Sequence, residues 1–191
     1  TVAYNSAATI SDTLNSVVEQ TYADIEYIVI DGGSTDNTVD LVRRYAAPKT
    51  ILVSEPDKGI YDAMNKGLAL ATGDVVGFLN SDDILANKEV ISKISDAFSD
   101  PTIDACYGDL VYVAQDDLSK VVRYWKSRSY EPGLCARGWM PAHPTFYVRR
   151  SVYQRHGGFD LSMKLQADFE MALKLLHTHQ IRTKYLPEVL V

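Results

Sequence analysis

One stretch of this sequence changes abruptly from apolar to polar residues, and its residue types are suited to chemistry. Residues 75–79 are Val-Val-Gly-Phe-Leu, and Asn80, Ser81, Asp82 and Asp83 follow directly. In parallel α/β sheets, ligands bind outside the carboxyl ends of the strands. Oxygen ligands with no Cys or His nearby suit a hard cation such as Mg²⁺ or Mn²⁺. Taken alone, the stretch supports a metal-assisted phosphate site and a simple helix cap about equally.

Other predicted strands also end in polar residues. Asn5 follows the first, Asp57 follows the third, and Asp31 to Asp36 (Asp-Gly-Gly-Ser-Thr-Asp) follows the second. A carboxylate at a strand end can accept hydrogen bonds from a nucleotide base or ribose, whereas an isolated polar turn needs no ligand. We favour the ligand role for Asp31 and a helix-capping role for Asp36. Several acidic ends at one sheet edge predict a binding site.

The segment 57–67, Asp-Lys-Gly-Ile-Tyr-Asp-Ala-Met-Asn-Lys-Gly, combines a loop with the start of a helix. Lys58 or Lys66 could meet a phosphate, and Asn65 could brace the loop. The alternative is a well-capped helix with solvated lysines, which we favour for Lys66 and Asp62.

Four familiar nucleotide- and phosphate-site motifs are absent. No Gly-x-Gly-x-x-Gly follows the first strand, and no Gly-Lys-Ser/Thr completes a phosphate-binding loop. Gly33 stands where aspartate-dependent phosphotransferases carry a second aspartate. Residues 5–8, Asn-Ser-Ala-Ala, also lack the glycines and basic residues of a sugar-nucleotide pyrophosphorylase loop. The site therefore belongs to another class of nucleotide user.

Composition sets the broad class. The 191 residues fit one domain, with 46% hydrophobic and 23% charged residues. The net charge of −6 argues against broad nucleic-acid binding, which needs a basic surface. Cys106 and Cys135 match no zinc spacing and require no disulfide, so we expect a reducing cytoplasm. Neither a membrane span nor a signal peptide is visible, and residues 1–4 and 186–191 both resemble strands cut by the ends of the sequence.

Periodicity indicates the elements that must position these residues. Strands and helices alternate four times in the first half, which predicts a parallel sheet covered by helices. The expected strands are residues 1–4, 25–30, 50–53 and 75–79, and the expected helices are residues 10–20, 39–45, 60–71 and 90–98.

The second half is less regular. A strand at 105–113 is expected to pair with 121–125, and residues 126–143 form a long loop carrying Arg137 and Trp139. Both side chains suit a sugar- and phosphate-holding loop, although Trp139 could simply be core. After a strand at 145–148, helices follow at 151–157 and 166–178.

The sequence resembles family 2 glycosyltransferases in five motifs that occur in the expected order. These are Tyr4-Asn5, residues 30–36, residues 57–67, residues 71–74 (Ala-Thr-Gly-Asp) and residues 79–83. The resemblance implies the GT-A fold, an α/β fold with a mixed, mostly parallel central sheet flanked by helices. We expect a single domain over residues 1–191, with a Rossmann-like nucleotide-binding half (1–100) and an irregular acceptor half (101–191).

The resemblance also implies roles in binding the donor and the metal. Asp31 matches the residue that holds the nucleotide base, with Tyr4 and Asn5 beside it, and Asp57 and Lys58 belong to the same donor site. Asn80-Ser81-Asp82 matches the family's metal-binding Asp-x-Asp motif, so Asp82 is the expected ligand of Mg²⁺ or Mn²⁺. Asn80 replaces the first carboxylate of that motif, and Asp83 offers another.

Asp168, in Leu-Gln-Ala-Asp-Phe-Glu, matches the catalytic base near the start of a late helix. An inverting transfer needs one carboxylate to take the proton of the acceptor hydroxyl. Glu170 competes for this role, and Asp168 could instead only stabilise the helix dipole. His143 could touch the diphosphate, complete the metal site or be structural.

Together these expectations describe an inverting enzyme of cell-surface polysaccharide synthesis. It would move sugar from a nucleoside diphosphate donor, UDP-linked in our prediction, to a glycan or lipid-linked acceptor. The alternative is a catalytically inactive nucleotide-sugar or glycan-binding module of the same fold. We expect a cytoplasmic location, with peripheral association at the inner face of the cytoplasmic membrane through segments outside this sequence.

Overall fold

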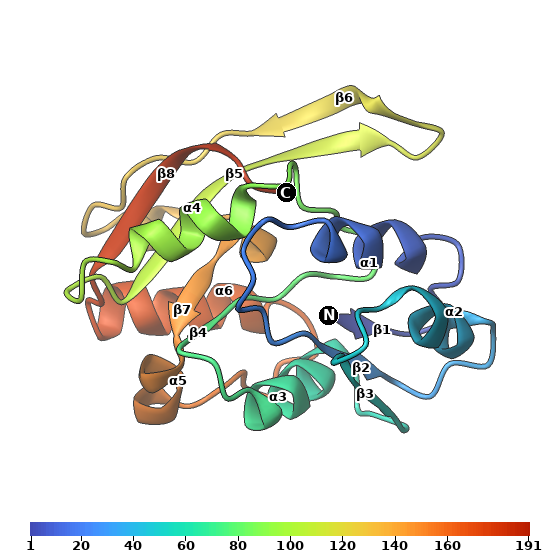
Figure 1. Cartoon of the computed structure of the whole chain (residues 1–191). Helices are drawn as coiled ribbons and strands as arrows, with labels where there is room; N and C mark the ends of the chain where they lie inside the picture. The colour runs from blue at the N-terminus through green and yellow to red at the C-terminus, as the bar shows by residue number, and fades with distance from the viewer.

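The computed structural model describes residues 1–191 as a mixed α/β fold built around two sheets. The first sheet is parallel, with strand order β1-β2-β3 (Figure 1). Its strands and crossover helices are β1 (Val2–Ala3), α1 (Ile10–Val18), β2 (Ile28–Asp31), α2 (Thr38–Tyr45) and β3 (Ile51–Ser54). The alternation of strands and helices predicted this arrangement correctly.

Burial of apolar residues explains why this first sheet forms. Val29 in β2 and Ile10 and Leu14 in α1 are completely buried, and they pack in one cluster with Ala3 and Val42. The helical residues are four apart and so share one face of α1. At about 1.5–3 kcal/mol for each large side chain removed from water, this burial is the main force that attaches the helices to the sheet.

The second sheet contains β4 (Val75–Val76), β5 (Ala105–Ala114), β6 (Asp117–Trp125), β7 (Tyr147–Arg149) and β8 (Thr183–Val189). Its order is β4-β7-β5-β6, with β8 also paired to β5. Three strand pairings in the molecule are parallel and three are antiparallel. The sheet structure is therefore mixed, as the predicted GT-A fold requires.

One predicted strand is wrong in its extent and its pairing. We expected residues 75–79 to form a full parallel strand, but β4 has two residues and pairs antiparallel with β7. The chain leaves this pairing at Gly77, where the ring of Tyr147 fills the space above the glycine. Asn80 then makes an isolated parallel bridge with Val2, which brings the polar stretch back beside β1.

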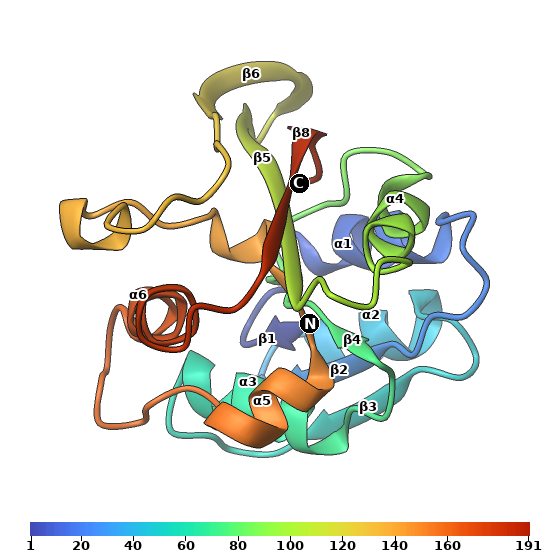
Figure 2. The ribbon, with the colours of Figure 1, turned by 90° about the vertical axis from the view of Figure 1, so that its left-hand side faces the viewer.

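Helices cover both faces of the long strand β5. In Figure 2, α4 (Val90–Ala97) and α6 (Ala167–Ala172) lie on opposite sides of β5 and β8. Cys106 packs in one core cluster with residues of α4, whereas Tyr107 packs in another with residues of α6. The remaining elements are α3 (Ile60–Leu70), α5 (Arg150–His156), the 3₁₀ turns η1 (Cys135–Arg137) and η2 (His143–Thr145), and a π-helical turn, η3 (Leu173–Thr178).

The predicted pairing of residues 105–113 with 121–125 is correct, although β6 begins earlier, at Asp117. The resulting β5–β6 hairpin projects from the body of the protein (Figure 1). Both cysteines are buried free thiols, and burial raises the pKa of Cys106 to about 12. None of the helices combines the length and the hydrophobicity needed to cross a bilayer.

Candidate active site

The polar residues that follow β1, β2 and β3 gather at one edge of the first sheet, together with residues 80–83. Ser6 and Ser81 share a hydrogen bond of 2.7 Å between their hydroxyl oxygens. The backbone N–H of Asn5 donates to Ser34 Oγ at 2.8 Å. We call this region the polar edge: residues 4–6, 31–36, 54–58 and 80–83. The structure therefore brings together segments that are up to about 80 residues apart in sequence.

Asp31 organises the polar edge from inside. It is completely buried, and its carboxylate accepts hydrogen bonds from the N–H groups of Gly33 (3.1 Å) and Ser34 (3.0 Å). The hydroxyls of Ser34 and Ser54 also donate to it. These bonds hold the loop after β2 against the end of β3. Contact of Asp31 with a nucleotide base remains a prediction.

Asn5 and Asp36 connect the loop after β1 to the loop after β2. Asn5 has a left-handed backbone (φ 49°), and its side-chain oxygen accepts from Thr35 N at 2.9 Å. Asp36 accepts from the N–H groups of Ala7 and Thr38, so it caps the start of α2 as predicted. Tyr4 is 63% exposed, which leaves its ring free at the rim.

The two lysines of segment 57–67 differ in their surroundings. Lys66 donates to Pro56 O at 3.1 Å and forms an ion pair with Glu55 at 2.8 Å. The ammonium of Lys58 is exposed and makes no ion pair or hydrogen bond in the chain. Asp57 accepts from Gly59 N at 2.8 Å, and its carboxylate lies against Gly32. Lys58 is thus the lysine available to a phosphate.

Within residues 80–83, the side-chain oxygen of Asn80 accepts no hydrogen bond. Asn80 Nδ2 donates to Asp83 Oδ2 at 2.8 Å, but Asn80 Oδ1 is buried and has no hydrogen-bond partner. Burial and then the charge of exposed Asp82 raise the pKa of Asp83 to about 6. A divalent cation would satisfy the amide oxygen and relieve the repulsion, so these residues fit a metal. No group of three or more His, Cys, Asp or Glu side chains lies close enough together to hold a metal ion.

Asp168 and Glu170 in the first turn of α6 have different partners. Tyr61 in α3 donates its phenolic O–H to Asp168 Oδ1 at 3.0 Å, and Asp168 remains partly exposed. Glu170 lies 3.8 Å from the ammonium of Lys174. Asp168 is therefore held by a neutral donor, whereas Glu170 is already paired with a cation.

His143 lies between the strand end and Asp168. Its ring stacks on Phe78 (5.9 Å between centroids) and meets the edge of Phe159 (5.7 Å). Burial lowers the pKa of His143, and the negative charge of Asp168 opposes this effect. These aromatic contacts suffice for a structural role, and contact of His143 with a metal or diphosphate remains a prediction.

The loop residues Trp139 and Arg137 differ in their surroundings. Trp139 stacks on Tyr130 at 6.0 Å and packs against Tyr107 at 5.8 Å, so the core alternative describes its position. Arg137 ends η1 and is exposed.

Our sequence analysis missed Tyr61 and Phe159. Tyr61 lies four residues before Asn65, so both are on one face of α3, and this spacing was the available signal. No pattern in the sequence identifies Phe159 as their common neighbour.

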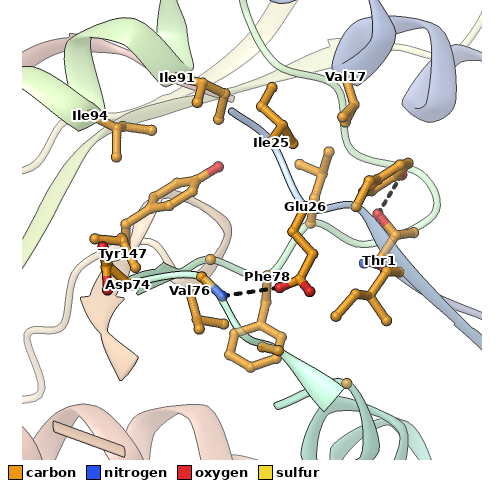
Figure 3. A pocket seen from close by; sticks show the side chains of 18 of the residues that line it. Thr1, Val17, Ile25, Glu26, Asp74, Val76, Phe78, Ile91, Ile94 and Tyr147 are labelled. Atoms are coloured by element: carbon orange, nitrogen blue, oxygen red, sulfur yellow. Dashed lines mark hydrogen bonds between the residues drawn. The ribbon is translucent and has the colours of Figure 1, made fainter. Parts of the chain in front are cut away.

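A cavity of about 750 Å³ lies elsewhere. Residues at the amino ends of the strands line it, among them Thr1 and Ile28, and it contains none of Asp31, Asp82 and Asp168 (Figure 3). At its wall the hydroxyls of Thr1 and Tyr27 share a hydrogen bond of 2.8 Å. Its size alone does not make it the site, because the candidate reactive groups lie at the other edge.

The mixed α/β fold, with its sheets flanked by helices, is that of the GT-A class of glycosyltransferases. The sequence model described as "Glycosyl transferase family 2" matches residues 1–160, and the chain belongs to this family.

Curated relatives agree with this assignment. The chain is 28% identical over 195 residues to a "PGL/p-HBAD biosynthesis glycosyltransferase" of Mycobacterium bovis, covering 95% of this chain and 70% of the relative. It is 32% identical over 178 residues to an uncharacterized glycosyltransferase of Mycobacterium tuberculosis, covering 91% and 66%.

Solved structures share the fold. The mannosyltransferase PcManGT of Pyrobaculum calidifontis, in complex with GDP-Man and Mn²⁺, has a TM-score of 0.74 and 25% identity, covering 98% of this chain and 53% of that one. S. aureus TarS 1–349 in complex with UDP-GlcNAc has a TM-score of 0.73 and 22% identity, covering 99% and 55%. The chain thus spans about half the length of these solved chains.

Proposed function

We propose that this chain forms the reacting domain of an inverting glycosyltransferase. It would transfer a sugar from a nucleoside diphosphate donor to a hydroxyl of a glycan or lipid-linked acceptor. The observation that carries the proposal is the hydrogen bond from Tyr61 to the partly exposed carboxylate of Asp168. Tyr61 stacks on Phe159, and Phe159 contacts Phe78, which lies two residues before Asn80. Residues 1–100 are proposed to bind the donor and residues 101–191 to supply the base and the acceptor surface.

The polar edge is the proposed donor site. Tyr4, Asn5 and Asp31 would surround the nucleotide, UDP in our proposal, and Asp57, Lys58, Asn80 and Ser81 would complete it. The exposed ammonium of Lys58 can neutralise a diphosphate oxygen. The complexes of PcManGT with GDP-Man and of TarS with UDP-GlcNAc support a nucleotide-sugar donor but leave open the base and sugar.

A divalent metal, Mg²⁺ or Mn²⁺, would be held by Asp82, with Asn80 Oδ1 and Asp83 as further oxygen ligands. When bound, such an ion acts as a Lewis acid that stabilises the leaving diphosphate. The unpartnered Asn80 oxygen supports this site, as does Mn²⁺ in the PcManGT complex.

Asp168 is the proposed general base. Its carboxylate would take the proton from the acceptor hydroxyl as that oxygen attacks the anomeric carbon from the side opposite the leaving group, which inverts the configuration. A role in cell-surface polysaccharide synthesis, at the inner face of the cytoplasmic membrane, completes the proposal. The Mycobacterium bovis relative is named a "PGL/p-HBAD biosynthesis glycosyltransferase", which supports a role in a biosynthetic pathway.

The test measures release of nucleoside diphosphate from UDP-glucose, UDP-N-acetylglucosamine and GDP-mannose, each with and without Mn²⁺. Asp168→Asn should lower turnover of the preferred donor about 1,000-fold while leaving its dissociation constant unchanged, because the amide cannot accept the proton. Glu170→Gln is the matched control and should retain most activity. Retained turnover in Asp168→Asn would remove it as the base. A wild-type protein that binds donors without releasing diphosphate would instead be the inactive binding module.

A further inference from the structure

Segment 57–67 contributes residues to the proposed donor site and also contacts the part of the chain that carries Asp168. Its first residues, Asp57 and Lys58, belong to the polar edge. Tyr61 and Asn65, one helical turn apart on α3, instead contact residues about 100 positions later in the chain. Residues four apart share a helix face, so α3 presents these two side chains together to the second half of the molecule.

Tyr61 makes two separate contacts with that half. Its ring stacks on Phe159, with 5.6 Å between centroids and 25° between the planes. Its hydroxyl donates to Asp168 Oδ1 at 3.0 Å. Burial and then the hydrogen bond to Asp168 raise the pKa of Tyr61, so the phenol stays protonated and can only donate to the carboxylate. Ring stacking alone would not need this hydroxyl.

Asn65 forms hydrogen bonds to the backbone of Phe159 with both the nitrogen and the oxygen of its side-chain amide. Asn65 Nδ2 donates to Phe159 O at 2.9 Å, and Phe159 N donates to Asn65 Oδ1 at 2.8 Å. A side chain at position 158 would come within 2.2 Å of Asn65 Oδ1, so Gly158 is required for this approach. The two amide bonds define the position of the chain nine residues before Asp168.

We propose that Tyr61 and Asn65 are positioning residues that set the carboxylate of Asp168 relative to the donor. The inference rests on the proposed function. Because α3 follows Asp57 and Lys58 directly, the same rigid helix carries the end of the donor site and the support of the base. Such support matters because a base displaced by about 1 Å can lose on the order of 100-fold in rate.

The test compares Tyr61→Phe with wild type in diphosphate release from the sugar nucleotide that the wild type turns over fastest. The substitution keeps the ring and its stacking but removes the donor to Asp168. We expect kcat to fall about tenfold, with KM for the donor and the melting temperature unchanged, because only the orientation of the base is lost. Asn65→Asp, which keeps the acceptor and loses the donor to Phe159 O, should also lower kcat without raising KM.

Tyr124→Phe is the matched control, since that phenol donates to Asp109 Oδ2 at 2.7 Å on the distant hairpin. It should leave kcat unchanged. A wild-type kcat in Tyr61→Phe, or a raised KM at unchanged kcat, would overturn the positioning role. That failure is distinct from failure of the proposed function, which would appear as turnover retained by Asp168→Asn or as no turnover by the wild type.

Discussion

Two aspartates are fully or almost fully buried in this molecule, and they obtain their hydrogen bonds in different ways. Asp31 receives donors from its neighbours Gly33 and Ser34 and from Ser54 on the adjacent strand. Asp109, which is 2% exposed, receives them from Ser127 N and from the hydroxyls of Tyr124 and Tyr185. The first carboxylate organises a loop of the polar edge, whereas the second joins β5 to β6, to the chain that follows β6 and to β8.

This difference shows which region of the molecule is held in place by its own hydrogen bonds. At the polar edge, loops bond to one another through short side chains, so most of its shape exists without a ligand. Beyond Asp109, the hairpin strand β6 is exposed along nearly its whole length, including Leu118, Val121 and Val122. Since buried polar groups must be paired, removing a buried acceptor that serves several donors should cost more than removing one exposed donor.

The largest expected effect is therefore at Asp31. Asp31→Ala would leave the backbone N–H groups of Gly33 and Ser34 and the hydroxyls of Ser34 and Ser54 without this acceptor, and should lower the free energy of unfolding by about 4 kcal/mol. Urea unfolding followed by circular dichroism measures this loss. The control Asp36→Ala removes an exposed carboxylate from the same loop and should cost clearly less. Equal losses in the two variants would contradict the special role of the buried carboxylate.

Asp83 should show a smaller, pH-dependent effect, because burial and then the charge of Asp82 disfavour its ionised form. The folded protein raises its pKa from the usual 3.8 to about 6, so the native state binds the proton more tightly than the unfolded chain does. The free energy of unfolding should therefore fall as pH rises from about 4 to about 6, by about 2 kcal/mol.

Urea midpoints measured in EDTA across this pH range test the effect. Asp83→Asn should flatten the curve, since the group can no longer ionise. An unchanged slope in Asp83→Asn would assign the pH dependence to another group.

The smallest expected effect lies at the hairpin. Tyr124 is 51% exposed, so water can replace the hydroxyl that Tyr124→Phe removes from Asp109. The substitution should lower the free energy of unfolding by about 0.5 kcal/mol, measured by the same urea titration. If Tyr124→Phe cost as much as Asp31→Ala, one exposed donor would matter as much as a whole buried acceptor. The contrast between the two regions would then fail.

Much of the first half was predictable because its signals are local. The β-branched run ending at Asp31, the period of residues 60–71 and the polar strand ends each lie within a dozen residues, and the structure places them as expected. The polar edge follows because successive parallel strands end on the same side of a sheet. The five family motifs lie largely in these same local segments, which is why the sequence alone was enough to indicate the family.

Tertiary structure alone decided three features. The strand expected at 75–79 shortened to Val75–Val76 because its partner is β7, more than 70 residues away. Asp109 became a junction because β6 and β8 both pair with β5. Asp168 acquired Tyr61 as its donor across 107 positions of sequence. Periodicity describes which face of an element is apolar, but it does not identify which distant element packs there, so these contacts exist only once both sheets and α3 have come together.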